Sequence, residues 1–169
     1  PVMLLSLVAP RLTALVGLRV LSVVGVSGIA VGMILLSRLG VDSSYWDVLW
    51  PLFIAAAGLG LSTAPATSAI VSDIPVDEQG VGAAVNDAMR EVGAAIGIAI
   101  GGSLLAGRYA RDIVDVLPMV PEAGRAAVES SFAGAVEFGA LAGPAAQPVV
   151  DAAAVVFTAG LSDALLALG

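Results

Sequence analysis

The chain has 169 residues, of which 59% are hydrophobic and only 12% are charged, and its mean hydropathy is +1.01. A soluble domain is about half apolar and about a quarter charged. The core of a chain this short cannot bury the excess of apolar residues, so some of these residues should face lipid. The net charge of −7 argues against a nucleic-acid partner, and the absence of Cys and His excludes a disulfide framework and imidazole chemistry.

The N-terminal third of the chain predicts two membrane helices. Residues 1–10 start within an apolar run without the basic segment of a signal peptide, so we expect a partial membrane helix there. After a short basic connector, residues 18–37 are long and apolar enough for a full span of a hydrocarbon core about 30 Å thick. Within this span Gly28 and Gly32 lie on one face, where another helix can approach closely.

Residues 48–72 predict the second full span. Its start is marked by an aromatic cluster that suits the membrane–water interface, namely Tyr45, Trp46 and Trp50. Pro65 removes a backbone donor and should kink or loosen the helix, and nearby Ser and Thr hydroxyls can bond the freed carbonyls. Two interpretations stay open for this segment: plasticity of one helix, or a hinge and weakly polar lining of a pathway.

The third predicted span, residues 81–109, organises the rest of the chain. It follows an acidic turn and carries no charge between Val92 and Gly107. Glycine recurs at every fourth position along this part, at Gly93, Gly97 and Gly101. The resulting stripe without side chains predicts close packing against another helix, which is how helices associate in lipid.

We expect residues 111–163 to form a polar, Pro-bearing loop outside the cytoplasm, with short helices lying on a surface. Residues 164–169 then resemble the start of a truncated final helix, so residues 1–110 would hold the membrane helices and the chain would be a piece of a longer membrane protein. Arginines on the two sides number three and four, so the positive-inside rule does not orient the chain.

No catalytic set is visible, because a nucleophile needs a His or Lys partner and the chain has neither. We therefore expect no enzyme, no cofactor and no metal site. The paired carboxylates Asp77 with Glu78 and Asp112 with Asp115 are best explained as solvated loop residues.

One polar cluster lies at the start of the Gly-striped helix: Asn86, Asp87, Arg90 and Glu91. Asp87 and Arg90 are spaced to pair, whereas Asp87 and Glu91 repel each other. The cluster is either a plain anchor at the end of a membrane helix or a cytoplasmic latch, in which Arg90 pairs across helices in one conformation only. Charges at the membrane are costly and tend to mark gates and pathways.

Two stretches give the chain a family resemblance. Residues 58–109, GLGLSTAPATSAIVSDIPVDEQGVGAAVNDAMREVGAAIGIAIGGSLLAGRY, are similar to late helices of major facilitator superfamily transporters, in the fourteen-helix drug:proton antiporter branch. Residues 9–25, APRLTALVGLRVLSVVG, are similar to a basic cytoplasmic loop of that family. The acidic segment after Tyr109 is similar to its extended outer loop.

The resemblance implies an all-α integral membrane helical bundle, part of the C-terminal half of the fold, with helices eleven to thirteen flanked by the ends of ten and fourteen. It places Arg11, Arg19 and the turn at 73–91 in the cytoplasm of a multi-pass protein of the bacterial inner membrane. The implied function is proton-coupled efflux of hydrophobic or cationic drugs.

The same resemblance implies the partners: the lipid bilayer, the missing N-terminal helices of the same transporter, a small hydrophobic substrate and protons. The proton-coupling residues would lie outside this chain, because no carboxylate lies deep within a predicted span. Two alternatives remain, a membrane scaffold or oligomerisation module without transport activity, and a soluble Ala-rich helical bundle.

Overall fold

The computed structural model describes residues 11–72 and 74–169. The partial helix expected at residues 1–10 lies outside this part. The described residues form helices and connecting turns without a β-strand, and four of the helices are long and apolar enough to cross a membrane. The predicted all-α membrane fold is confirmed at this level, with one more candidate span than the three full spans we expected.

The chain divides into two compact units. The first holds helix α2 (Leu18–Leu36), helix α3 (Tyr45–Ser72) and the part of α4 (Gln79–Asp112) up to Ile98. The second holds the loop Ser37–Ser44 and residues Ala99–Ala167. Each unit is described below by itself.

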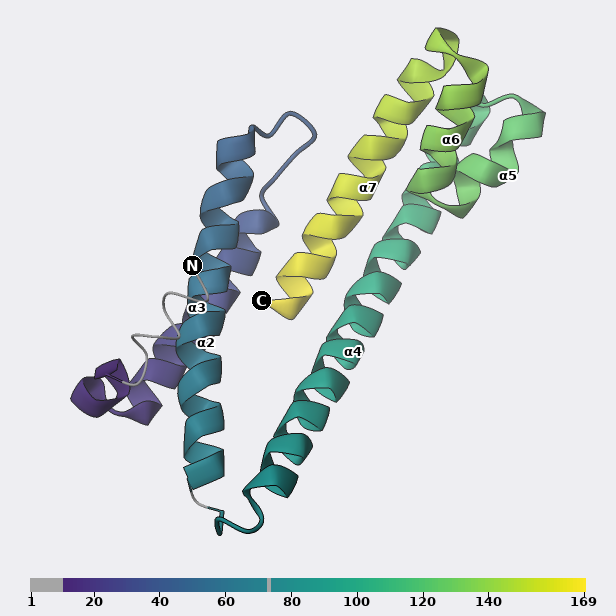
Figure 1. Ribbon diagram of the computed structural model, residues 1–169. Helices are drawn as coiled ribbons and strands as arrows, with labels where there is room; N and C mark the ends of the chain where they lie inside the picture. The colour runs from purple at the N-terminus through teal and green to yellow at the C-terminus, as the bar shows by residue number, and fades with distance from the viewer. Residues whose placement is uncertain (1–10, 73) are drawn as a thin grey trace. The chain divides into compact units, whose positions relative to one another are not determined.

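In the first unit, α2 and α3 pack side by side (Figure 1). A Cβ atom built on Gly25 would lie 2.8 Å from the carbonyl oxygen of Gly58, and one on Gly32 would lie 2.6 Å from the Cβ of Ala55. At Gly28 the same construction gives 3.3 Å to the Cα of Gly58. Glycine is therefore required for this close approach, which maximises the dispersion contacts that hold helices together in lipid.

Helix α3 continues through both Pro51 and Pro65. Proline lacks the N–H of the helical hydrogen bond, so a carbonyl one turn earlier loses its usual donor at each position. Near Pro65 the Ser62 hydroxyl donates a hydrogen bond to the Leu59 carbonyl at 3.3 Å. This carbonyl is not the one that Pro65 frees, which belongs to residue 61, so the expected bond from a hydroxyl to the freed carbonyl stays a prediction.

Helix α4 is longer than a membrane requires. Its 34 residues correspond to about 51 Å at 1.5 Å per residue, against a hydrocarbon core of about 30 Å. The uncharged part between Val92 and Gly107 can lie within the core, and the charged ends of α4 then extend beyond it. The predicted span at 81–109 falls inside the observed helix.

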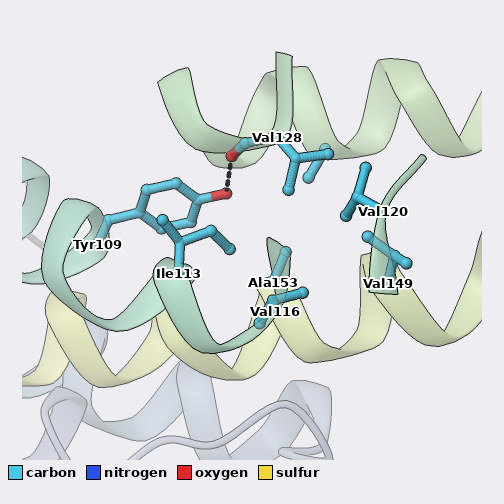
Figure 2. Close-up of a cluster of buried hydrophobic side chains, with 8 residues drawn as sticks. Tyr109, Ile113, Val116, Val120, Val128, Val149 and Ala153 are labelled. Atoms are coloured by element: carbon cyan, nitrogen blue, oxygen red, sulfur yellow. Dashed lines mark hydrogen bonds between the residues drawn. The ribbon is translucent and has the colours of Figure 1, made fainter. Parts of the chain in front are cut away.

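The second unit contains two short 3₁₀ helices, η1 (Ile113–Asp115) and η2 (Leu117–Met119), followed by helices α5 (Glu122–Ser130) and α6 (Phe132–Ala142). A third 3₁₀ turn, η3 (Pro144–Ala146), leads into α7 (Gln147–Leu168). Figure 2 shows the apolar core that these elements share with the end of α4, and its members are Tyr109, Ile113, Val116, Val120, Val128, Ala135, Val149 and Ala153.

The end of the chain differs from the prediction. A loop was expected up to residue 163, with a helix starting at 164, but α7 is continuous from Gln147. Gly143 makes the break, because its φ of 75° is a conformation that L side chains rarely adopt. Pro148 is the second residue of α7, where a missing N–H costs nothing, so it starts the helix instead of interrupting it.

Polar contacts connect α7 to its neighbours in the second unit. Arg108 pairs with Asp112 on its own helix at 2.6 Å and with Asp163 of α7 at 3.3 Å. The Ser162 hydroxyl donates to the carbonyl of Ser37 in the loop after α2. At Gly160 a Cβ would lie 3.0 Å from the Leu105 side chain, so α7 also packs closely on α4 here.

Candidate functional site

Three of the four predicted latch residues, Asp87, Arg90 and Glu91, line a cleft in the first unit. The cleft has a volume of about 580 Å³ and lies between the later half of α3 and the first half of α4. Its lining comprises Leu59, Thr63, Asp87, Arg90, Glu91 and Ala94. The structure therefore brings the polar cluster of α4 next to the hydroxyl-bearing helix that contains Pro65.

Helical spacing explains why the charged side chains gather here. Asp87 and Arg90 are three residues apart and pair at 3.7 Å, with 69% and 55% of their side chains exposed. An exposed pair of this kind contributes at most about 1 kcal/mol, so it restrains Arg90 only weakly. No ion pair joins Arg90 to another helix within the part of the chain that the structure describes.

A side-chain hydrogen bond from Asn86 joins the two helices near the cleft. Its Nδ2 donates a hydrogen bond to Oγ1 of Thr67 on α3, at 3.3 Å and partly buried. Sequence reasoning placed Asn86 in the latch cluster and Thr67 only among the hydroxyls near Pro65, and it did not bring the two together. The available signal was the hydroxyl group following Pro65, which was expected only to bond backbone carbonyls.

The predicted packing glycines fall into two groups. Gly28 and Gly32 lie against α3, as described above. Gly101 is buried, whereas a Cβ on Gly93 or Gly97 would meet no atom within 4 Å. Among the described residues, no other element therefore packs against the glycine stripe of α4 at Gly93 and Gly97.

The cleft offers hydrogen bonds and charge, but no set of metal ligands. Among residues 11–72 and 74–169, no group of three or more His, Cys, Asp or Glu side chains could hold a metal ion. Its lining offers polar partners that could exchange: a guanidinium weakly held by Asp87, the carboxylate residue Glu91 and the hydroxyl residue Thr63.

The chain is similar to a multidrug efflux pump. The pump is LfrA of Mycolicibacterium smegmatis, and the two sequences are 25% identical over 142 residues. The similarity covers 84% of this chain and 28% of LfrA, so the chain spans less than a third of the length of its relative. No family model matches the chain, and no solved structure matches it.

The similarity to LfrA agrees with the character of the helices. The apolar spans of this chain and the relationship to an efflux pump together indicate a membrane protein related to transporters.

Proposed function

We propose that this chain forms part of a proton-coupled multidrug efflux transporter of the major facilitator superfamily, in a bacterial inner membrane. The observation that carries the proposal is the similarity to LfrA over 84% of the chain, together with four helices suited to crossing a membrane. The chain would act with further helices of the same transporter. Hydrophobic or cationic drugs would be moved by rocking of two helical halves around a central site.

Within this proposal the cleft between α3 and α4 acts as a cytoplasmic latch. The Asn86–Thr67 hydrogen bond holds the two helices in register, and Arg90 lies at the cleft with only a weak partner on its own helix. In one conformation Arg90 pairs with a carboxylate of another helix, and in the other it returns to Asp87. Breaking the Arg90–Asp87 ion pair costs little free energy, because both side chains are exposed.

The experiment measures dye efflux from proteoliposomes containing the intact transporter under an imposed proton gradient. Arg90→Ala is expected to lower the efflux rate while the amount of inserted protein is unchanged. Arg111→Ala is the matched control, because Arg111 is also exposed and lies at the other end of the same helix. Equal efflux in both variants would make Arg90 an anchor, and efflux that ignores the proton gradient would refute proton coupling.

One observation favours a second function, a membrane scaffold or oligomerisation module without transport activity. The bare surface at Gly93 and Gly97 is open in the described chain and suits close contact with a helix from elsewhere. Stable complexes in native membranes, combined with absent proton-dependent efflux, would support this function over transport.

A further inference from the structure

An apolar groove lies in the second unit and shares no lining residue with the cleft of the predicted latch. It has a volume of about 190 Å³ and is bordered by the later part of α4, the turn between α5 and α6, and α7. The rings of Phe132 and Phe157 form part of its wall and stack with their centroids 4.9 Å apart. The lining residues of α4 recur at helical spacing on one face: Gly102, Leu105, Ala106, Tyr109 and Ala110.

The hydroxyl groups around this groove already make hydrogen bonds inside the second unit. Tyr109 and Ser130 each donate to a backbone carbonyl of α5, at 2.9 and 2.8 Å, and Figure 2 shows the first of these bonds. The Ser131 hydroxyl accepts from a backbone N–H of α6 at 3.1 Å. Glu129, the charged residue of the lining, is exposed. The groove therefore recognises a ligand through apolar contacts.

The groove crosses the level at which α4 leaves the hydrocarbon core. Its lining begins at Gly102, within the uncharged part of α4, and ends at Ala110, beyond the charge of Arg108. These eight residues of helix correspond to about 12 Å. Charged side chains are costly in hydrocarbon, so Arg108 marks the boundary of the core. The first part of the groove is thus continuous with the surface of α4 that faces lipid.

This placement favours a phospholipid as the occupant. Acyl chains begin at the same boundary and extend into the core beside the helices, as the groove does along α4. A pocket for a whole drug usually has a volume of about 300–1,000 Å³, so a groove of about 190 Å³ is small for a drug and suits part of one slim alkyl chain.

We propose that the groove holds one acyl chain of a bilayer phospholipid, with the lipid headgroup beside the α5–α6 turn. Bulk lipid is as apolar as the groove, so packing retains the chain and the hydrophobic effect does not. Dispersion contacts with Leu105 and the two stacked rings supply that packing. The inference needs only a membrane fold and does not rest on transport.

A side chain that fills the groove should displace the lipid chain. Gly102→Leu is the variant of choice, because a Cβ on Gly102 meets no atom within 4 Å and the backbone need not move. Gly97→Leu is the matched control. It makes the same substitution on the same helix, a Cβ there also meets no atom within 4 Å, and Gly97 does not line the groove.

The four phenylalanines of the chain provide the assay. The full chain carries ¹³C-phenylalanine in nanodiscs of phosphatidylcholine, and NMR measures nuclear Overhauser effects between the acyl methylene protons and each ring. Phe132 and Phe157 should show these contacts, and Phe138, which does not line the groove, should not. Phe53 is 48% exposed on α3 and serves as the reference for ordinary lipid contact.

Relative to Phe53, the lipid contacts of Phe132 and Phe157 should fall at least about twofold in Gly102→Leu, because the dispersion contacts of the chain are lost, and should be unchanged in Gly97→Leu. Equal contacts in the two folded variants would overturn the proposal. In the unmodified chain, ring contacts with water in place of acyl protons would overturn it whether or not the variants fold. Contacts with a second, differently labelled copy of the chain in place of lipid would show that protein covers the groove, and would overturn it as well.

Discussion

The close packing of α2 on α3 predicts that a single methyl group at Gly32 destabilises the first unit. A Cβ there would lie 2.6 Å from the Cβ of Ala55, 2.8 Å from its nitrogen and 2.9 Å from its Cα. Ordinary carbon–carbon contacts lie at about 3.5–4.0 Å, so the helices must separate locally by about 1 Å. Backbone atoms cannot turn away as a flexible side chain would, and neighbouring contacts along the interface are weakened too.

The magnitude follows from two opposing terms. Overpacking of a tight interface costs about 1–3 kcal/mol, whereas replacing glycine with alanine inside a helix recovers about 1 kcal/mol. Gly97 supplies the control, because a Cβ there meets nothing within 4 Å and only the favourable term applies. The two variants should therefore differ by about 1–3 kcal/mol, or about 2–12 °C in melting temperature for a chain of this size.

The assay is thermal unfolding in detergent, followed by tryptophan fluorescence. Both tryptophans, Trp46 and Trp50, lie on α3, so their emission reports on the helix that the substitution displaces. Gly32→Ala should melt below the unmodified chain, and Gly97→Ala at or above it. Equal melting temperatures for the two variants would refute the reasoning, because they would show that the α2–α3 contact does not need a bare backbone.

Two further predictions concern the second unit. Tyr109→Phe removes a buried hydroxyl that donates to a backbone carbonyl at 2.9 Å, and it leaves that carbonyl without this donor. The free energy of unfolding, measured by chemical denaturation, should therefore fall by about 1–3 kcal/mol. Tyr45→Phe is the control, because Tyr45 is exposed. A double-mutant cycle with Arg108→Gln and Asp163→Asn should give a coupling energy of about 0.2–1 kcal/mol that falls with added salt, because both side chains are about half exposed; a coupling that salt does not change would contradict this assignment.

Several features could be read from the sequence because they depend only on neighbouring residues. Hydropathy over about twenty residues located α2, α3 and α4, since the length and apolar character of a span are local properties. The spacing of Asp87 and Arg90 likewise predicts their ion pair, because residues three apart lie on one face of any helix.

Local signals were ambiguous at the start of α7. Gly143 and Pro148 both discourage helix in isolation. In the structure α6 ends at Gly143, whereas Pro148 lies in the first turn of α7, where its ring fits. The buried packing of Val149 and Ala153 in the apolar core then stabilises a helix that the sequence pattern did not indicate.

The sequence by itself thus determined that the chain is helical, apolar enough for lipid, and polar at one end of α4. The tertiary structure alone decided which faces meet: Asn86 with Thr67, Gly32 with Ala55, and Phe132 with Phe157. The physical reason is that helix formation is governed by residues within one or two turns, whereas the register between two helices depends on side-chain shape along the whole contact. That register placed the glycines of α2 against α3 and left the glycine surface at Gly97 uncovered among the residues described.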